Sequence, residues 1–224
     1  MKIVVIHGQN HKGSTYQLTK LLIDELSERS DEIQEFQTND IQACIGCFSC
    51  VIKDEELCPQ RSAVAPIITA IEQSDIIIIE SPNYCMEMSG QLKIFFDHMA
   101  YRWISHRPHP SMKNKIGIAV STTAGVGAKG TAKSIARQMF YWGVAKTYCI
   151  PFIISAMNWD EIKIEKKAKI TKTVKKTARK IKKTILKVKP GIKSRFMFNI
   201  MRSAQKNSTW NPVDRNHWED NKWI

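Results

Sequence analysis

The sequence predicts a doubly wound α/β fold, in which a five-stranded parallel sheet carries helices on both faces and a C-terminal helical extension follows. Strand-like apolar runs alternate with helix-like segments over about the first 155 of the 224 residues. Two of these runs are apolar throughout, which is typical of strands buried on both faces. Parallel strands also need long crossover connections, and the intervening helices supply them.

The five expected strands differ in how clearly the residues indicate them. Asp75–Glu80, with four consecutive isoleucines, is β-branched almost throughout and gives the strongest signal. Lys2–His7 is the next clearest, whereas Glu32–Gln37 mixes polar and apolar residues. The strands are expected at Lys2–His7, Glu32–Gln37, Asp75–Glu80, Ile116–Thr122 and Thr147–Ile154.

Four helices are expected between these strands. In the first, Leu18, Leu22 and Leu26 recur at helical spacing, and in the third Leu92, Phe95, Phe96 and Met99 share one face. The predicted ranges are Ser14–Arg29, Ala63–Gln73, Gln91–Trp103 and Gly130–Trp142.

The net charge of +13 belongs almost entirely to the C-terminal extension. Residues 160–196 contain 15 Lys or Arg and 3 acidic residues, and the remainder of the chain is nearly neutral. We therefore divide the chain into a domain at 1–157 and a basic helical extension at 158–224. A long helix is expected over Glu161–Lys189, ended by Pro190-Gly191, and a second short helix over Ile192–Ala204.

An apolar stripe on the long helix indicates docking. It repeats at three- and four-residue spacing: Val174, Ala178, Ile181, Ile185 and Val188. A helix that only tracked phosphates would not need it, so we expect the stripe to cover the same domain or a second subunit. The alternative is a nucleic-acid or anionic-membrane binder, but no nucleic-acid-binding motif is present, and we expect neither partner.

Composition narrows the class of protein. No apolar run approaches the ~20 residues of a membrane-spanning helix, and the N-terminus reads as a strand rather than a signal peptide. Six cysteines without a secretory signal argue against a disulfide framework. Neither a Ser-His-Asp set nor an H-E-x-x-H motif supports hydrolysis. These features predict a soluble cytoplasmic protein.

The loop after the first strand has the character of a phosphate site. Gly8 and Gly13 have the spacing of the nucleoside-triphosphate loop, but Ser14 stands where that motif needs lysine. The G-x-G-x-x-G fingerprint of dinucleotide-binding proteins is also absent. Hydroxyls of Ser14 and Thr15 at a helix start suit a terminal monophosphate. The alternative is that Ser14 only caps the helix.

Two further loops lie at the same predicted edge of the sheet, where doubly wound proteins bind ligands. The segment Ser81–Gly90 mixes turn residues with Tyr84, Met86 and Met88, a combination that suits a planar ring. The segment Ser121–Ala128 is small and glycine-containing, so its backbone could approach a ligand closely. Each could equally be a packed or flexible turn.

Together these loops resemble the NADPH-dependent FMN reductase and iron-sulfur flavoprotein branch of the flavodoxin-like superfamily. The resemblance covers roughly residues 1–155, and the Asp214-x-x-x-Trp218 ending resembles that of some members. It implies a flavodoxin-like sheet and FMN. By position, the phosphate would be held by His11, Ser14 and Thr15, and Gln9 of the same loop would also contact the cofactor. The flavin ring would be lined by Pro82, Asn83, Tyr84, Cys85, Met86, Thr122, Thr123, Ala124 and Gly125. The resemblance assigns no catalytic side chain.

The cysteine-rich loop allows three interpretations. Cys44, Cys47, Cys50 and Cys58 have spacings that could ligate a [4Fe–4S] cluster, with proline after the last cysteine as in bacterial ferredoxins. Four cysteines are also a structural zinc set, and free thiols are the third possibility. Cys149 is expected in the core, and Cys85 either near the flavin or as a small buried hydrophobe.

The predicted function is an FMN-dependent NAD(P)H oxidoreductase. It would pass hydride from NAD(P)H through the flavin to a small acceptor, namely a quinone, free flavin, nitro or azo compound. The alternative is an FMN and iron–sulfur electron carrier that serves partner proteins. A homodimer is expected from the resemblance. The positions of His98, His106 and His109 leave surface and substrate-rim roles open.

Overall fold

All five strands form one parallel sheet in the order β2-β1-β3-β4-β5. In this computed structural model the backbone of the whole chain is described, as are all side chains except those of Ile104 and Ser105. This strand order is that of flavodoxin-like proteins, so the predicted fold class is confirmed. The strands are β1 (Lys2–His7), β2 (Glu32–Gln37), β3 (Ile76–Glu80), β4 (Ile116–Thr123) and β5 (Lys146–Ile153).

The central strands are buried because each contributes side chains to two apolar clusters, one on either face of the sheet. In β3, Ile77 and Ile79 point into one apolar cluster, whereas Ile76 and Ile78 point into the other. Side chains alternate between the faces of a sheet, so a strand covered on both faces needs an unbroken apolar run. The edge strand β2 pairs only with β1 and retains a mixed sequence.

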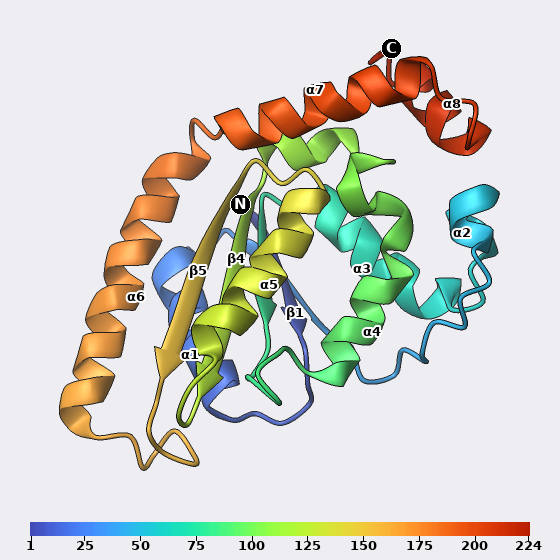
Figure 1. Cartoon of the computed structure of the whole chain (residues 1–224). Coiled ribbons are helices and arrows are strands. Elements are labelled where there is room, and N and C mark those ends of the chain that lie inside the picture. The colour runs from blue at the N-terminus through green and yellow to red at the C-terminus, as the bar shows by residue number, and fades with distance from the viewer.

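Helices cover both faces (Figure 1). The helices α3 (Arg61–Gln73), α4 (Gly90–His98) and α5 (Ala128–Tyr141) supply the first cluster, and α1 (Ser14–Leu26) and α6 (Ile164–Ile185) supply the second. Shorter helical turns are α2 (Ser49–Ile52), η1 (Glu55–Leu57), η2 (Ala100–Ser105) and η3 (Pro110–Asn114).

Two expectations about this part of the chain are wrong. One continuous helix is expected over Gln91–Trp103, but the α-helix ends at His98. After Met99 the chain forms a separate 3₁₀ turn, η2. Cys149 is exposed rather than in the core. It lies on β5, which is an edge strand with only β4 beside it, and among the residues of β5 only Ile150 is buried.

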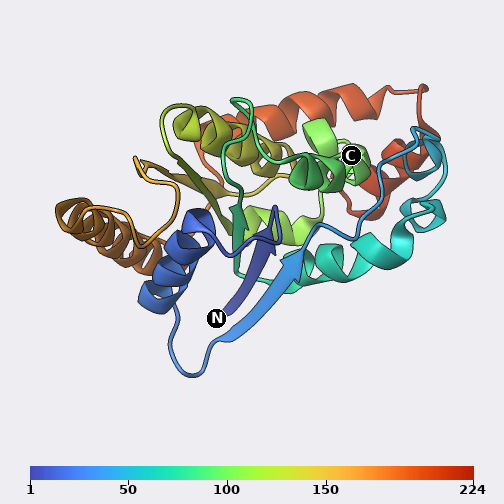
Figure 2. The ribbon, with the colours of Figure 1, turned by 90° about the horizontal axis from the view of Figure 1, so that it is seen from below.

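The long basic helix α6 lies beside α1 (Figures 1 and 2). Val174, Ala178 and Ile181 of its stripe are buried in the second apolar cluster, and Ile185 and Val188 are partly buried at the margin. Ile170, which precedes the stripe, is buried in the same cluster. The lysines of α6 point outward, and Lys175 pairs with Glu25 of α1 at 3.4 Å. The extension thus completes the layer that covers this face of the sheet.

The chain ends in α7 (Ile192–Lys206) and α8 (Pro212–Asp220), the latter not predicted from the sequence. Trp218 is fully buried, and its indole N–H donates to the carbonyl of His106 at 2.6 Å. Asp214 is buried four residues earlier and pairs with Arg107 at 3.0 Å. The two ends of the Asp-x-x-x-Trp motif therefore fasten the extension to the loop before η3. Whether residue 157 is a domain boundary stays a prediction.

In the described chain, no helix combines the length and apolar character required to cross a membrane.

We predict that Ile181→Asp lowers the free energy of unfolding by at least about 4 kcal/mol, because it puts a charge into a fully buried apolar site. Lys176→Glu with Lys183→Glu is the matched control, since both lysines lie on the same helix outside the apolar stripe. Urea unfolding of the variants measures the effect. Equal loss in both variants would contradict the packing role of the stripe.

Candidate functional site

Three loops converge at the carboxyl edge of the sheet, after β1, β3 and β4. The first loop approaches the end of β3 closely, since the Gly8 N–H donates to the carbonyl of Glu80 at 2.8 Å. A Cβ at Gly8 would lie 2.7 Å from that same oxygen, so only glycine fits without a shift. The Ser89 hydroxyl, from the start of α4, donates to the Gly8 carbonyl and fixes the loop from a second side.

The first loop is ordered by its own residues. The Gln9 side-chain amide bonds to both backbone groups of His11, accepting from the N–H at 3.2 Å and donating to the carbonyl. The Gly13 N–H donates to the same carbonyl at 2.8 Å. Gln9 therefore shapes the loop, whereas the exposed His11 side chain lies over Gly13, whose added Cβ would lie 2.8 Å from the ring.

Helix α1 begins without a side-chain cap. Its N-cap is Gly13, and the Ser14 hydroxyl makes no capping bond, so the interpretation of Ser14 as a cap is wrong. Ser14 is only 7% exposed, and its hydroxyl oxygen has no partner among the described residues. A buried hydroxyl without a partner costs free energy unless a ligand satisfies it. It stands at a helix N-terminus, where the dipole favours an anion.

The neighbouring Thr15 has a different role. Its hydroxyl shares a 2.6 Å hydrogen bond with that of Thr122 at the end of β4, and both residues are buried. Thr15 therefore joins the first loop to the third. A further contact of either hydroxyl with a phosphate would add to this bond, since each hydroxyl has spare acceptor capacity.

Asn83 joins the second loop to the third. Its N–H donates to the Thr122 carbonyl at 2.9 Å, and its side-chain amide donates to the Val126 carbonyl at 3.0 Å. Its side-chain oxygen accepts from Thr131 on α5 at 2.7 Å. Gly127 packs against this amide with φ +102°, a backbone conformation that favours glycine.

The tip of the second loop is a tight turn in a strained conformation. Tyr84 and Glu87 exchange two backbone hydrogen bonds of 2.8 and 2.9 Å. Between them Cys85 and Met86 both have positive φ, +48° and +67°. Left-handed backbone is uncommon for residues other than glycine, and such strain clusters at ligand sites. The side chains of Tyr84, Cys85 and Met86 are exposed, so the alternative of Cys85 as a buried hydrophobe is wrong.

The third loop is tied to the end of β5. The Thr123 hydroxyl donates to the Val126 carbonyl at 2.9 Å, and the Ala124 carbonyl accepts from the N–H of Ser155 at 3.1 Å. A Cβ added at Gly125 would meet no atom within 4 Å, so the space above the loop is open. All three predicted loops therefore meet at one edge; contact of their residues with a flavin stays a prediction.

A buried charged cluster beneath these loops was missed from the sequence. His7 is 1% exposed and bonds to Glu80 at 3.0 Å and to Glu35 at 2.9 Å, and so connects β1 to β3 and β2. Burial raises the pKa of Glu80. Burial alone would lower the pKa of His7, but its bonds to the two carboxyl groups outweigh this, and the pKa is raised. The available signal was a polar residue ending each of two otherwise apolar strands.

The four spaced cysteines line one small hollow of about 50 Å³ together with His98. The Cys58 sulfur lies 3.5 Å from Nδ1 of His98, whose Nε2 lies 2.8 Å from the Gln42 carbonyl oxygen. Burial, followed by the neighbouring Cys58 and Cys44, raises the pKa of the Cys50 thiol. All six cysteines are free thiols. No three His, Cys, Asp or Glu side chains among the described residues are arranged to hold a single metal ion.

This fold and these joined loops define a flavodoxin-like protein. The chain belongs to the NADPH-dependent FMN reductase family, whose model matches residues 1–158. The family resemblance expected from the loops is thus confirmed.

Two curated relatives are named iron-sulfur flavoproteins. An iron-sulfur flavoprotein of Archaeoglobus fulgidus is 29% identical over 157 residues, covering 68% of this chain and 69% of its own. The iron-sulfur flavoprotein MJ1083 of Methanocaldococcus jannaschii is 31% identical, over 55% of this chain and 63% of its own. This chain therefore spans about two thirds of the length of these relatives.

Solved structures share the fold at low identity. A flavone reductase superposes with a TM-score of 0.61 at 15% identity, covering 85% of this chain and 66% of its own.

We predict that the contribution of His7 to the stability of the apoprotein is lost as pH rises above about 6.5. The raised pKa of His7 means that the folded state binds more protons than the unfolded one above the ordinary value of 6.5, so His7 stabilises at low pH and this contribution is lost through its folded pKa. His7→Gln should flatten the profile. Urea unfolding across this pH range measures it, and an identical slope in both proteins would contradict the assignment.

Proposed function

We propose that the protein is an FMN-dependent oxidoreductase that accepts hydride from NAD(P)H and delivers it to a small acceptor. The observation that carries this proposal is the buried, unpartnered Ser14 hydroxyl at the start of α1, beside loops joined to one another by hydrogen bonds within the described chain. Membership of the FMN reductase family supports FMN as the ligand of this edge.

The residues present fit a flavin mononucleotide. Ser14, Thr15 and the backbone N–H groups at the start of α1 would hold the phosphate, with His11 at the exposed side. The turn at Tyr84–Met86 and the backbone of Thr122–Gly125 would frame the ring. When bound, FMN supplies the hydride chemistry, and the protein supplies its position and electrostatics.

The chain's own residues set the geometry of that site. Asn83 holds the second and third loops together, and the Cys85–Met86 turn holds the backbone between Tyr84 and Glu87 in one conformation. At the rim of the site, the side chains of Tyr84, Met86 and Val126 are each more than half exposed. Such flat and polarizable groups suit a planar partner better than a charged one.

The acceptor we propose is a small aromatic oxidant, with quinones first. A Burkholderia pseudomallei relative named FMN-dependent NADH:quinone oxidoreductase is 28% identical over 125 residues, covering 52% of this chain and 57% of its own. The exposed apolar rim supports this class. Free flavins, nitro and azo compounds have the same planar character and are tested in the same assay.

A second candidate function rests on the cysteine hollow. We propose that Cys44, Cys47, Cys50 and Cys58 hold a [4Fe–4S] cluster, which would let the protein pass single electrons to a partner. The four thiols line one hollow, and a cluster with one thiolate on each iron needs them further apart than the ligands of a single ion do. Two curated relatives named iron-sulfur flavoproteins support this proposal.

Assembly as a homodimer is also a proposal. The exposed apolar residues at the flavin-side loops would gain cover from a second copy.

Ser14→Ala should weaken FMN binding by about 1–3 kcal/mol, because it removes a hydroxyl bond to a charged phosphate. The apoprotein should keep or gain stability, since the lost hydroxyl has no partner within the described chain. Thr19→Val is the matched control. The Thr19 hydroxyl is also buried and has no partner among the described residues, but it lies more than one turn further along α1 from the loop. Fluorescence titration of FMN measures both, and equal weakening in the two variants would contradict the phosphate site.

Oxidation of NAD(P)H with a quinone should follow ping-pong kinetics, because both substrates would use one face of the flavin in turn. Parallel double-reciprocal lines are expected from initial rates at several fixed quinone concentrations. Intersecting lines would argue against a shared site.

Anaerobically purified protein should contain about four iron and four sulfide per chain. Cys50→Ser should lower both strongly, whereas Cys149→Ser, an exposed cysteine on β5, should leave them unchanged. Iron and acid-labile sulfide assays decide the matter. If the wild-type protein contained no sulfide, the electron-carrier proposal would be contradicted and the small-acceptor proposal would be unaffected.

A further inference from the structure

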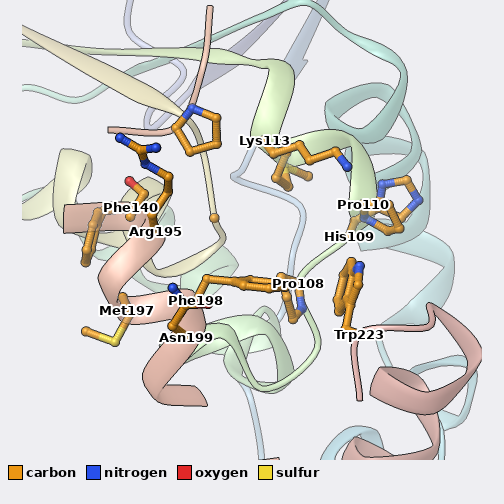
Figure 3. Close-up of a pocket in the computed structure, with 14 residues that line it drawn as sticks. Pro108, His109, Pro110, Lys113, Phe140, Arg195, Met197, Phe198, Asn199 and Trp223 are labelled. Carbon is orange, nitrogen blue, oxygen red and sulfur yellow. The ribbon is translucent and has the colours of Figure 1, made fainter. Parts of the chain in front are cut away.

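A sizeable cavity lies at the opposite edge of the sheet from the flavin-side loops. It has a volume of about 410 Å³ and lies between α7, the segment around η3 and the end of α5 (Figure 3). Met112 and Lys113 precede β4, and Gly143 precedes β5, so these walls belong to the amino ends of the strands. Figure 1 shows α7 crossing this edge.

One side of the cavity is apolar and held in place. Phe198 and Trp223 meet edge to face with ring centroids 5.3 Å apart, and both pack against the buried Trp218 at 5.0 and 5.2 Å. The Trp223 N–H donates to the Trp218 carbonyl at 2.9 Å. Pro108 and Phe140 extend the wall. An apolar wall that is already formed loses little entropy when a ligand binds.

The charged side chains at this cavity are all basic. Lys113 and Arg195 line it, and no acidic residue of the described chain does. Both residues are exposed, and Figure 3 shows Lys113 extending toward His109 and Pro110 and Arg195 at the other end of the cavity. Neither has an ion pair or a side-chain hydrogen bond within the described part of the chain. The nearby Arg102 and Arg107, by contrast, pair with the carboxylates of Glu72 and Asp214.

The third basic residue, His109, is already engaged. Its Nδ1 bonds to the Ser111 hydroxyl at 2.8 Å, and burial lowers its pKa, so the imidazole is mainly neutral at pH 7. The positive charge at the cavity therefore comes from Lys113 and Arg195, two long side chains on different elements.

We propose that this cavity binds a small amphipathic anion, a carboxylate on a flat apolar body. The ring would lie against Phe198 and Trp223, and the carboxylate would lie between the two ends of the cavity, where the flexible Lys113 and Arg195 side chains can turn toward it. Lys113 and Arg195 are exposed to water, and a carboxylate gains charge-assisted hydrogen bonds there that a neutral hydrophobe cannot make. A highly charged phosphate ester would make no use of the aromatic wall. Because α7 and Trp223 lie beyond residue 158, the site combines the family domain with the extension.

The probe is 2-naphthoate, titrated by calorimetry into FMN-loaded full-length protein, with 2-naphthylmethanol as the neutral analogue. We expect one naphthoate per chain. Lys113→Gln with Arg195→Gln should weaken it by about tenfold or more through loss of two charged contacts, and should not alter binding of the alcohol. Arg202→Gln with Lys206→Gln is the matched control, since both residues are exposed on α7 and do not line the cavity.

A second variant tests the space rather than the charge. Ser194→Phe places a ring into the cavity while keeping both cations, and should abolish naphthoate binding in protein whose melting temperature is unchanged. Absence of naphthoate binding to the wild type would overturn the proposal. So would binding that both double variants weaken equally, or binding that shifts the flavin absorbance and competes with NADPH, which would place the probe at the flavin.

Discussion

The closure of the first loop onto the neighbouring strands is the constraint on which the rest of the site depends. Gly8 comes so close to Glu80 that a methyl group would collide with its carbonyl, and the Thr15–Thr122 bond then draws β4 toward the start of α1. These contacts cross between three strands, so the loops can only be placed once the sheet has formed. The cost of leaving the Ser14 hydroxyl unpartnered within the described chain is consistent with a site built for a ligand rather than for stability alone.

The C-terminal extension shows how a strongly basic segment can serve packing. Its charge suggests a polyanion partner, yet α6 turns its apolar stripe inward and completes the second core beside α1. Burial of four such side chains is favourable at about 25 cal/mol per Å². The lysines remain at the surface, where they keep a long helix hydrated. Farther along, α7 crosses the amino edge of the sheet and α8 lies beside α2, and Trp218 anchors α8 to the loop at His106.

The elements that could be predicted from the sequence are those whose signals are local. β1 and β2 have the predicted bounds, and α6 has the predicted stripe, because hydrophobic periodicity reports which face is covered. The features that could not be predicted depend on contacts between distant residues. The pairing of Arg107 with Asp214, the His98–Cys58 contact and the exposure of Cys149 follow from how elements meet. The three loops could be placed at one edge from topology, but their mutual hydrogen bonds could not.

The central claim is that the edge formed by these loops recognises a flavin through one terminal phosphate. The most direct measurement compares the affinities of the apoprotein for FMN and for riboflavin, which share the ring and ribityl chain and differ only in the phosphate. FMN is expected to bind at least about a hundredfold more tightly, because riboflavin lacks several charge-assisted hydrogen bonds. Equal affinities would contradict the claim, because the start of α1 would then have no part in binding.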